Sequence, residues 1–197
     1  KETDVSASAL HVQRPEGNYS FVYRSPSFFE QEYFLLGDDQ KTLTKLPFPM
    51  GGQLRAVFQG RIIMSLRSDW RTATHDFKAG TLVALPIASL SKPDPTADLV
   101  TLFTPSARVS LADVYDTKDF LILNLLDNVK SRLDKLTFVD DKPVTEAIPL
   151  NSDGTLTVVS TSTHENRFFV QYESFLTPST LYLVDMDSSG KLTATIA

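Results

Sequence analysis

The sequence predicts an all-β fold made of about four units, each with four antiparallel strands. Apolar and polar residues alternate over short runs, which is the period-two pattern of strands with one buried face, and helical spacing is scarce. The strongest runs also recur: if Tyr19, Ile62, Phe120 and Phe168 are equivalent starts, they lie 43, 58 and 48 residues apart. Periods of about 40–50 residues with four strands each are typical of β-propeller blades.

The second and third strands of each unit are predicted to form a hairpin. The second strands are rich in aromatic and β-branched residues, and we expect them at Tyr19–Arg24, Arg61–Leu66, Phe120–Leu126 and Phe168–Tyr172. After a polar link, the third strands follow at Phe29–Leu36, Thr81–Ile87, Arg132–Phe138 and Thr180–Met186. Two loops, around Arg71–Phe77 and Ser91–Ala97, account for the long middle spacing. The second loop contains Pro93 and Pro95, which a central strand excludes.

The fourth and first strands complete each unit. The fourth strands, which usually follow Gly or Asp turn residues such as those at 37–39 and 188–190, are expected at Thr42–Leu46, Leu99–Phe103, Val144–Ile148 and Leu192–Ile196. The first strands, which would be innermost in a propeller and would line its channel, are expected near Leu10–Gln13, Leu54–Phe58, Val109–Tyr115 and Leu156–Thr161. The predicted blades are Lys1–Pro47, Gly52–Thr104, Ala107–Pro149 and Gly154–Ala197.

Four such blades either close a small ring or form an open arc cut from a larger ring. A blade cannot bury both of its faces alone, so neighbouring blades are expected to stack. An open arc would leave apolar faces at its two ends, and these would favour a homo-oligomer.

Composition narrows the classes of function. With 42% hydrophobic and 22% charged residues, the chain is predicted to be folded and soluble. A net charge of −5 with interspersed signs argues against nucleic acid and anionic lipid as partners. No apolar run is long enough to span a membrane. The absence of cysteine removes thiolate metal sites and disulfides but leaves the compartment open between cytoplasm and periplasm.

No residue of the chain is expected to be catalytic, cofactor-binding or metal-binding. The G-x-S-x-G sequence of a serine hydrolase is absent at all eight glycines, and His11, His75 and His164 stand far apart. The acidic pairs match no calcium-loop spacing and are expected to be solvated turn residues; they are Asp38-Asp39, Asp113/Asp116 and Asp140-Asp141.

Four further segments have an ordinary structural interpretation. Arg67–Trp70 presents the only tryptophan beside two charges, which suits either a ligand site or packing over a blade edge with Asp69 in a turn, and packing is favoured. Asn18–Ser20 fits a glycosylation pattern that chance explains. Asp127–Lys130 is predicted as a hairpin turn with Asn128 left-handed, and Ser174–Pro178 as a link between strands.

Three stretches resemble a known family: Ile62–Trp70, the region from Asp119 to Leu133 and Ser174–Tyr182. They look like the propeller domain of prolyl oligopeptidase family serine peptidases, particularly a bacterial branch. The resemblance covers about three quarters of the chain and lies in strand and turn motifs. It implies a seven-bladed propeller over an α/β-hydrolase domain that cleaves after proline. Since Phe175–Pro178 is similar to a motif of the last blade, the chain resembles the last four blades, and none of the catalytic triad maps onto it.

The resemblance therefore implies a noncatalytic propeller segment. Its partners would be the α/β-hydrolase domain of the same parent chain and short peptides containing proline, to which it would gate access. The alternatives are a free-standing propeller that acts as a protein or peptide interaction module, and a small glycan- or ligand-binding propeller, for which Trp70 is thin support.

Overall fold

The chain folds into two units, residues 1–104 and 105–197, each built from two four-stranded antiparallel sheets. The computed structural model describes residues 4–151, 153–187 and 190–197. The turn expected at 188–190 therefore lies mostly outside the described residues, as does the start of the first predicted blade. The fold is all-β, with four blade-like sheets as expected, and corresponds to a partial β-propeller.

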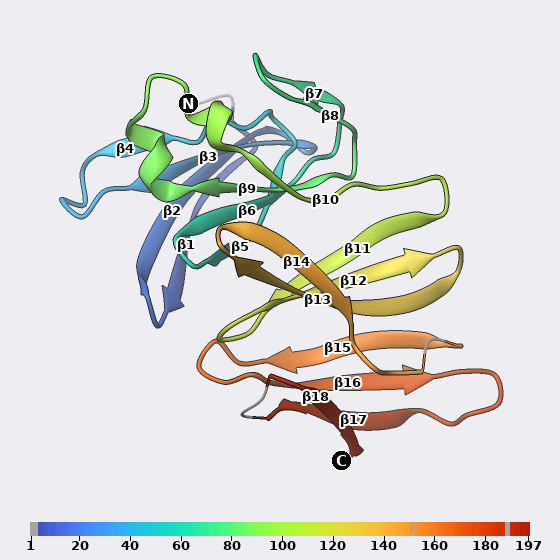
Figure 1. Cartoon of the computed structure of the whole chain (residues 1–197). Helices are drawn as coiled ribbons and strands as arrows, with labels where there is room; N and C mark the ends of the chain where they lie inside the picture. The colour runs from blue at the N-terminus through green and yellow to red at the C-terminus, as the bar shows by residue number, and fades with distance from the viewer. Residues whose placement is uncertain (1–3, 152, 188–189) are drawn as a thin grey trace. The chain divides into compact units, whose positions relative to one another are not determined.

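The first unit contains two of these sheets (Figure 1). One has the order β1-β2-β3-β4, and its strands are β1 (Ser6–Arg14), β2 (Gly17–Ser27), β3 (Glu30–Leu36) and β4 (Leu43–Lys45). The other has the order β10-β9-β6-β5, and its strands are β5 (Gln53–Phe58), β6 (Arg61–Ser65), β9 (Leu82–Pro86) and β10 (Val100–Phe103).

The second unit contains the other two sheets. The strands of the first, in order across the sheet, are β11 (Val109–Asp116), β12 (Leu121–Asp127), β13 (Lys130–Val139) and β14 (Lys142–Ala147). Those of the second are β15 (Thr155–Thr161), β16 (Arg167–Glu173), β17 (Thr180–Met186) and β18 (Leu192–Ile196). All sixteen expected strands are thus found among the described residues, and two of them, β17 and β18, have the expected bounds.

A hydrophobic core lies between the two sheets of each unit. Strand alternation supplies it: in β16, Phe168, Val170 and Tyr172 are buried while the residues between them are more exposed. In the second unit the rings of Phe120 and Phe168 meet edge to face, with centroids 6.2 Å apart. The core of the first unit joins Phe21 of β2 to apolar residues of β5, β6 and β9. Stacking of neighbouring sheets therefore buries the apolar faces, as the sequence predicts.

Left-handed residues close several of the hairpins. The turn between β13 and β14 places Asp140 and Asp141 at φ of 49° and 62°, the signature of a type I′ turn, and Gln59 with Gly60 does the same between β5 and β6. Asn128 has φ of 59° between β12 and β13, as its residue type predicts. These turns set the register of the strands that they join.

The two long connections of the sheet β10-β9-β6-β5 contain more regular structure than the sequence predicts. The expected loop at Arg71–Phe77 contains two short strands, β7 (Trp70–Arg71) and β8 (Asp76–Phe77), which pair as a separate ribbon (Figure 1). Stacking of Trp70 on Phe77 and an ion pair between Arg71 and Asp76 stabilise it. Strands of only two residues are too short to show an alternation of apolar and polar residues, so the sequence pattern does not predict them.

Two 3₁₀ helices follow β9. The first, η1 (Ile87–Ser91), takes Ile87 out of the strand expected at Thr81–Ile87. The second, η2 (Pro95–Asp98), lies within the proline-containing loop, where the Asp94 carboxylate accepts a hydrogen bond from the Thr96 backbone N–H at 3.0 Å. Pro95 at the first turn loses no hydrogen bond there, so the two residues together favour a short helix.

The outer strands β14 and β18 differ in chemistry. β14 carries Lys142, Pro143 and Glu146, whereas β18 reads Leu-Thr-Ala-Thr-Ile and carries neither a charge nor a proline. Each pairs with one neighbouring strand of its sheet.

Candidate functional site

Three of the four-stranded sheets have two chemically different ends, and these are the sheets β1–β4, β11–β14 and β15–β18. The chain enters and leaves a sheet at the same end, because four antiparallel strands reverse direction three times, and the turn between the second and third strands lies at that end too. We call it the linker end. In the sheet β15–β18 its turn exposes Phe175 and Leu176, in β11–β14 it exposes Val129, and in β1–β4 it exposes Phe28 and Phe29. Large apolar side chains therefore gather at linker ends.

The opposite ends of the same sheets carry polar turns. The β1–β2 turn consists of Pro15 and Glu16, and the β13–β14 turn consists of Asp140 and Asp141. The β15–β16 connection holds polar residues at 162–166, of which Asn166 bonds to Asp119 of the neighbouring sheet. The contrast within single sheets shows that the apolar turns are not a general property of the loops.

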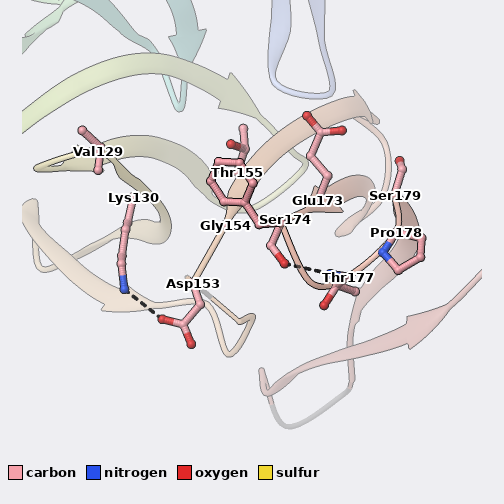
Figure 2. Close-up of a pocket in the computed structure, with 11 residues that line it drawn as sticks. Val129, Lys130, Asp153, Gly154, Thr155, Glu173, Ser174, Thr177, Pro178 and Ser179 are labelled. Carbon is pink, nitrogen blue, oxygen red and sulfur yellow. Dashed lines mark hydrogen bonds and ion pairs between the residues drawn. The ribbon is translucent and has the colours of Figure 1, made fainter.

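A cavity of about 610 Å³ lies at the linker end of the second unit (Figure 2). It is bounded by three segments: the β12–β13 turn, the start of β15 and the β16–β17 turn. Its lining residues are Val129, Lys130, Asp153, Gly154, Thr155, Glu173, Ser174, Phe175, Thr177, Pro178 and Ser179. We call it the tip cavity.

The β16–β17 turn is fixed by its own hydrogen bonds. The Ser174 hydroxyl oxygen accepts from the backbone N–H groups of Leu176 and Thr177, at 3.3 and 3.1 Å, and the Ser174 N–H donates to the Thr177 carbonyl at 3.2 Å. Pro178 fixes the backbone after the turn, and its carbonyl accepts from the Thr180 hydroxyl. Since the polar atoms point inward, Phe175 and Leu176 project from the turn.

The opposite wall of the tip cavity carries two side chains of opposite charge, which form an ion pair and so leave this wall without net charge. The Lys130 ammonium contacts the Asp153 carboxylate at 3.0 Å, as Figure 2 shows. Both groups are exposed, so the pair adds little stability but holds a cation and an anion at the rim. Gly154 lies between the walls, and the Ser131 N–H donates to its carbonyl at 3.3 Å, which joins the two sheets at this point.

The cavity can bind an apolar group, but it holds no arrangement for nucleophilic catalysis. The Ser174 hydroxyl oxygen accepts backbone hydrogen bonds within the turn, and none of the three histidines lines the cavity. His11 bonds to Ser20 across β1 and β2, while His75 and His164 bond to the threonines that precede them.

The acidic pairs lie on turns and strands, apart from one another. Asp39 accepts hydrogen bonds from the Thr42 hydroxyl and from two backbone N–H groups, which hold its pKa at about 2. Within 4–151, 153–187 and 190–197, no three acidic or histidine side chains gather as a metal would require. In the same residues no helix is long and apolar enough to cross a bilayer.

Trp70 packs against aromatic neighbours, as the sequence-based interpretation favours. Its ring stacks on Phe77 at 5.5 Å and meets Phe48 at 5.8 Å. Asp69 closes the adjoining turn by accepting from the Ala79 N–H and from Lys78, both at 2.9 Å, and these bonds lower its pKa.

Sequence reasoning missed the tip cavity. It treats Asp127–Lys130 and Ser174–Pro178 as separate structural links, whereas the structure brings both to one cavity. One signal in the sequence could have indicated a binding surface here: Phe175 and Leu176 occupy a turn between polar residues. Large apolar side chains in a turn are not buried in the core, so they remain exposed to a ligand or partner.

Comparison with known proteins identifies the domain. A family model described as the N-terminal β-propeller domain of prolyl oligopeptidase matches residues 51–195. An uncharacterized peptidase of Sinorhizobium fredii is 30% identical over 205 residues and aligns with 100% of this chain. An uncharacterized peptidase of Rickettsia prowazekii is 29% identical over 185 residues, covering 91% of this chain. The chain spans 28% and 25% of the length of these two relatives.

Solved structures show the same fold. A post-proline cleaving enzyme from Rickettsia typhi superposes on 98% of this chain with a TM-score of 0.81 and 26% identity. Oligopeptidase B from Leishmania major superposes on 97% with a TM-score of 0.66, and its 16% identity shows likeness of fold alone. The chain covers 28% of each of these two proteins.

Proposed function

The chain belongs to the prolyl oligopeptidase family, as part of its N-terminal β-propeller domain, and we propose that it is a noncatalytic propeller segment that gates a serine peptidase. Its partner would be an α/β-hydrolase domain of the same parent protein, and its substrates short peptides that contain proline. The observation that carries the proposal is the match of the propeller-domain model to residues 51–195. The post-proline cleavage named for the Rickettsia typhi enzyme supports the choice of proline.

The gating role is proposed from what the propeller fold supplies. In this proposal, the nucleophile, base and orienting acid that cleave the peptide bond belong to the hydrolase domain. A ring of blades admits a flexible peptide through its channel or past its rim and rejects a folded protein by size. Closure over the hydrolase domain would also exclude water from the reaction.

The first strands of the sheets are the residues proposed to line the channel. Each sheet has such a strand at one edge, where the chain enters it, and these strands are β1, β5, β11 and β15. Within them, the predicted segments Leu10–Gln13 and Leu156–Thr161 expose several side chains, whereas Val57 and Phe58 of β5 are buried in the core. Val57 and Phe58 therefore serve packing.

The test uses the complete coding sequence of the parent protein. We expect it to encode G-x-S-x-G outside this segment, and the purified product to cleave a short peptide after proline but not the same sequence inside a folded protein. The matched control replaces the serine of that motif by alanine. A product that cleaves no proline peptide, or that cleaves both substrates equally, contradicts the proposal.

The exposed Phe175-Leu176 turn also suits a free-standing interaction module. In that case the coding sequence would contain no hydrolase motif, and the chain would bind other proteins or copies of itself through exposed blade faces. Sedimentation equilibrium separates the two: a free-standing open arc forms dimers as concentration rises, whereas a strictly monomeric species contradicts it.

A further inference from the structure

We propose that the second unit binds the carboxyl end of a short peptide, with the terminal carboxylate on Arg108 and the apolar side chain of the last residue in the tip cavity. This inference rests on the proposed function, because it names the part of a peptide substrate that the propeller segment holds. All of the residues involved belong to the second unit.

A second cavity, of about 310 Å³, adjoins the tip cavity at the β12–β13 turn. Lys130 lines both cavities, whereas Val129 lines the tip cavity and the preceding Asn128 lines the second one. Every described residue that lines the second cavity is polar or charged, and these residues are Arg108, Asp127, Asn128, Lys130, Ser131 and Arg132. We call it the arginine cavity. A cavity that offers apolar side chains and a polar cavity therefore meet at one turn.

Arg108 is the cation of the arginine cavity that lacks a partner. Two N–H groups of Arg132 donate to the Asp134 carboxylate, at 2.9 and 3.0 Å. Lys130 pairs with Asp153, as described above. The Arg108 side chain is exposed, and its guanidinium forms no hydrogen bond or ion pair with any other residue that the structure describes. Because its N–H groups match the two oxygens of a carboxylate, Arg108 can bind one in a bidentate manner.

The backbone holds Arg108 in place beside the turn. The Asn128 N–H donates to the Arg108 carbonyl at 2.8 Å. The Ser106 hydroxyl oxygen accepts from the N–H groups of Arg108 and Val109, at 3.2 and 3.0 Å. The base of the arginine side chain is therefore fixed before a ligand arrives, which reduces the entropy lost on binding.

Asp127 is the anion that lines the arginine cavity, and its charge is offset by its neighbours. Its carboxylate accepts a hydrogen bond from the Asn128 side-chain amide at 3.2 Å and lies 3.8 Å from the guanidinium of Arg132. A second carboxylate entering the cavity is therefore drawn to the unpaired guanidinium of Arg108, where its attraction is not shared with another anion.

Glu173 sets the direction in which an anionic ligand lies. It lines the tip cavity on the side away from Lys130, as Figure 2 shows. Its carboxylate repels a carboxylate on that side, so the ligand anion is expected on the side of the arginine cavity. A polyanion such as nucleic acid would place further negative charges against Glu173, and the site therefore suits a ligand with a single carboxylate next to an apolar group.

The carboxyl end of a peptide has this chemistry. The terminal carboxylate and the last side chain are attached to the same carbon atom, so they can enter two cavities that share a wall. In the tip cavity an apolar side chain would meet Val129, Phe175 and Pro178. The volumes of about 610 and 310 Å³ suit a short peptide, because sites for small ligands span about 300–1,000 Å³.

Photocrosslinking of the full-length parent protein tests the site. The probe is the tripeptide Ala-Ala-p-benzoylphenylalanine, whose last side chain is apolar and attaches to nearby C–H bonds on illumination. Its matched control is the same tripeptide with a C-terminal carboxamide, which lacks the negative charge. The serine of the G-x-S-x-G motif is replaced by alanine so that the probe is not cleaved, and mass spectrometry identifies the crosslinked residues.

We expect the acid form to crosslink within residues 127–131 or 173–179, with half-saturation at a concentration about tenfold lower than for the carboxamide. Arg108→Gln should raise the half-saturation concentration of the acid about tenfold and leave that of the carboxamide unchanged. Arg67→Gln, at an exposed arginine of the first unit, should change neither.

Three results would overturn the proposal. The first is equal half-saturation by the acid and the carboxamide in the protein that retains Arg108, a comparison that does not depend on how a variant folds. The second is a preference for the acid that survives Arg108→Gln. The third is crosslinking confined to residues outside both turns, which is also the result expected if another domain covers the site.

Peptidase assays on the protein with its serine intact separate this proposal from the proposed function. A protein that cleaves after proline but shows any of these three results refutes the carboxylate site alone. A protein that binds the acid at the two turns through Arg108 but cleaves no proline peptide refutes the proposed function alone.

Discussion

Replacing Gly154 by alanine should destabilise the second unit by a steric effect that can be worked out from the structure. A Cβ atom at this position would lie 2.2 Å from the Glu173 carbonyl oxygen, where ordinary contacts begin at 3.4 Å, and 2.9 Å from the Ser174 side chain. Because the first obstacle is backbone, β15 must move away from β16 by roughly 1 Å. Overpacking of this kind costs about 1–3 kcal/mol. Weakening a neighbouring ladder bond adds about 1 kcal/mol, so we expect a loss of about 2–4 kcal/mol.

Equilibrium unfolding in urea, followed by circular dichroism, measures this loss. Gly60→Ala is the matched control: its φ is +68° and nothing lies within 4 Å of the added carbon, so only a conformational cost of about 1–2 kcal/mol applies. Enlarging the new side chain from alanine to serine should raise the cost at position 154 and leave it unchanged at position 60. Equal costs of alanine and serine at position 154 would refute the steric reasoning.

Three further predictions concern the core, the junction between sheets and a titrating turn. Phe168→Ala should cost about 3–5 kcal/mol in urea unfolding because the side chain is buried against Phe120, and a loss below about 1 kcal/mol would contradict that packing. Asn166→Ala removes two hydrogen bonds to Asp119 of the neighbouring sheet, at 2.6 and 2.9 Å, and should cost about 1 kcal/mol in the same assay. The pKa of Asp39 is lowered from 3.8 to about 2, so its contribution to stability is complete above pH 3.8 and is lost as the pH falls towards 2. Thr42→Ala should raise this pKa, measured by NMR titration of the carboxyl carbon; an unchanged pKa would show that the hydroxyl does not stabilise the carboxylate.

The sequence predicts the four sheets well because their signal is local and repeated. Alternation in a segment such as Phe168–Tyr172 depends only on which face of the strand is buried, and each hairpin carries its own turn residues. The β7–β8 ribbon was not predictable in this way, because aromatic stacking stabilises it over only two residues in each strand. Helix η2 had a local signal in Asp94 followed by Pro95 that alternation does not capture.

The tip cavity depends on contacts between sheets. Val129 and Phe175 are far apart in sequence and line one cavity only after the two sheets that contain β12–β13 and β16–β17 have stacked, so neither turn alone predicts the other. What the sequence does indicate is that Phe175 and Leu176 occupy a turn, which is where an apolar residue requires an explanation beyond packing.

β18 lacks both charged residues and proline, and this affects how the protein behaves in concentrated solution. An outer strand offers unpaired backbone groups to any extended segment that meets it, and charges or proline normally discourage such pairing. β14 has both kinds of protection, whereas Leu192–Ile196 has neither, and Ile196 is exposed. Edge-to-edge addition of strands to the isolated segment is therefore expected at β18 more readily than at β14. A lysine at position 193 or 195 would be the smallest change that makes the segment resistant to fibre formation.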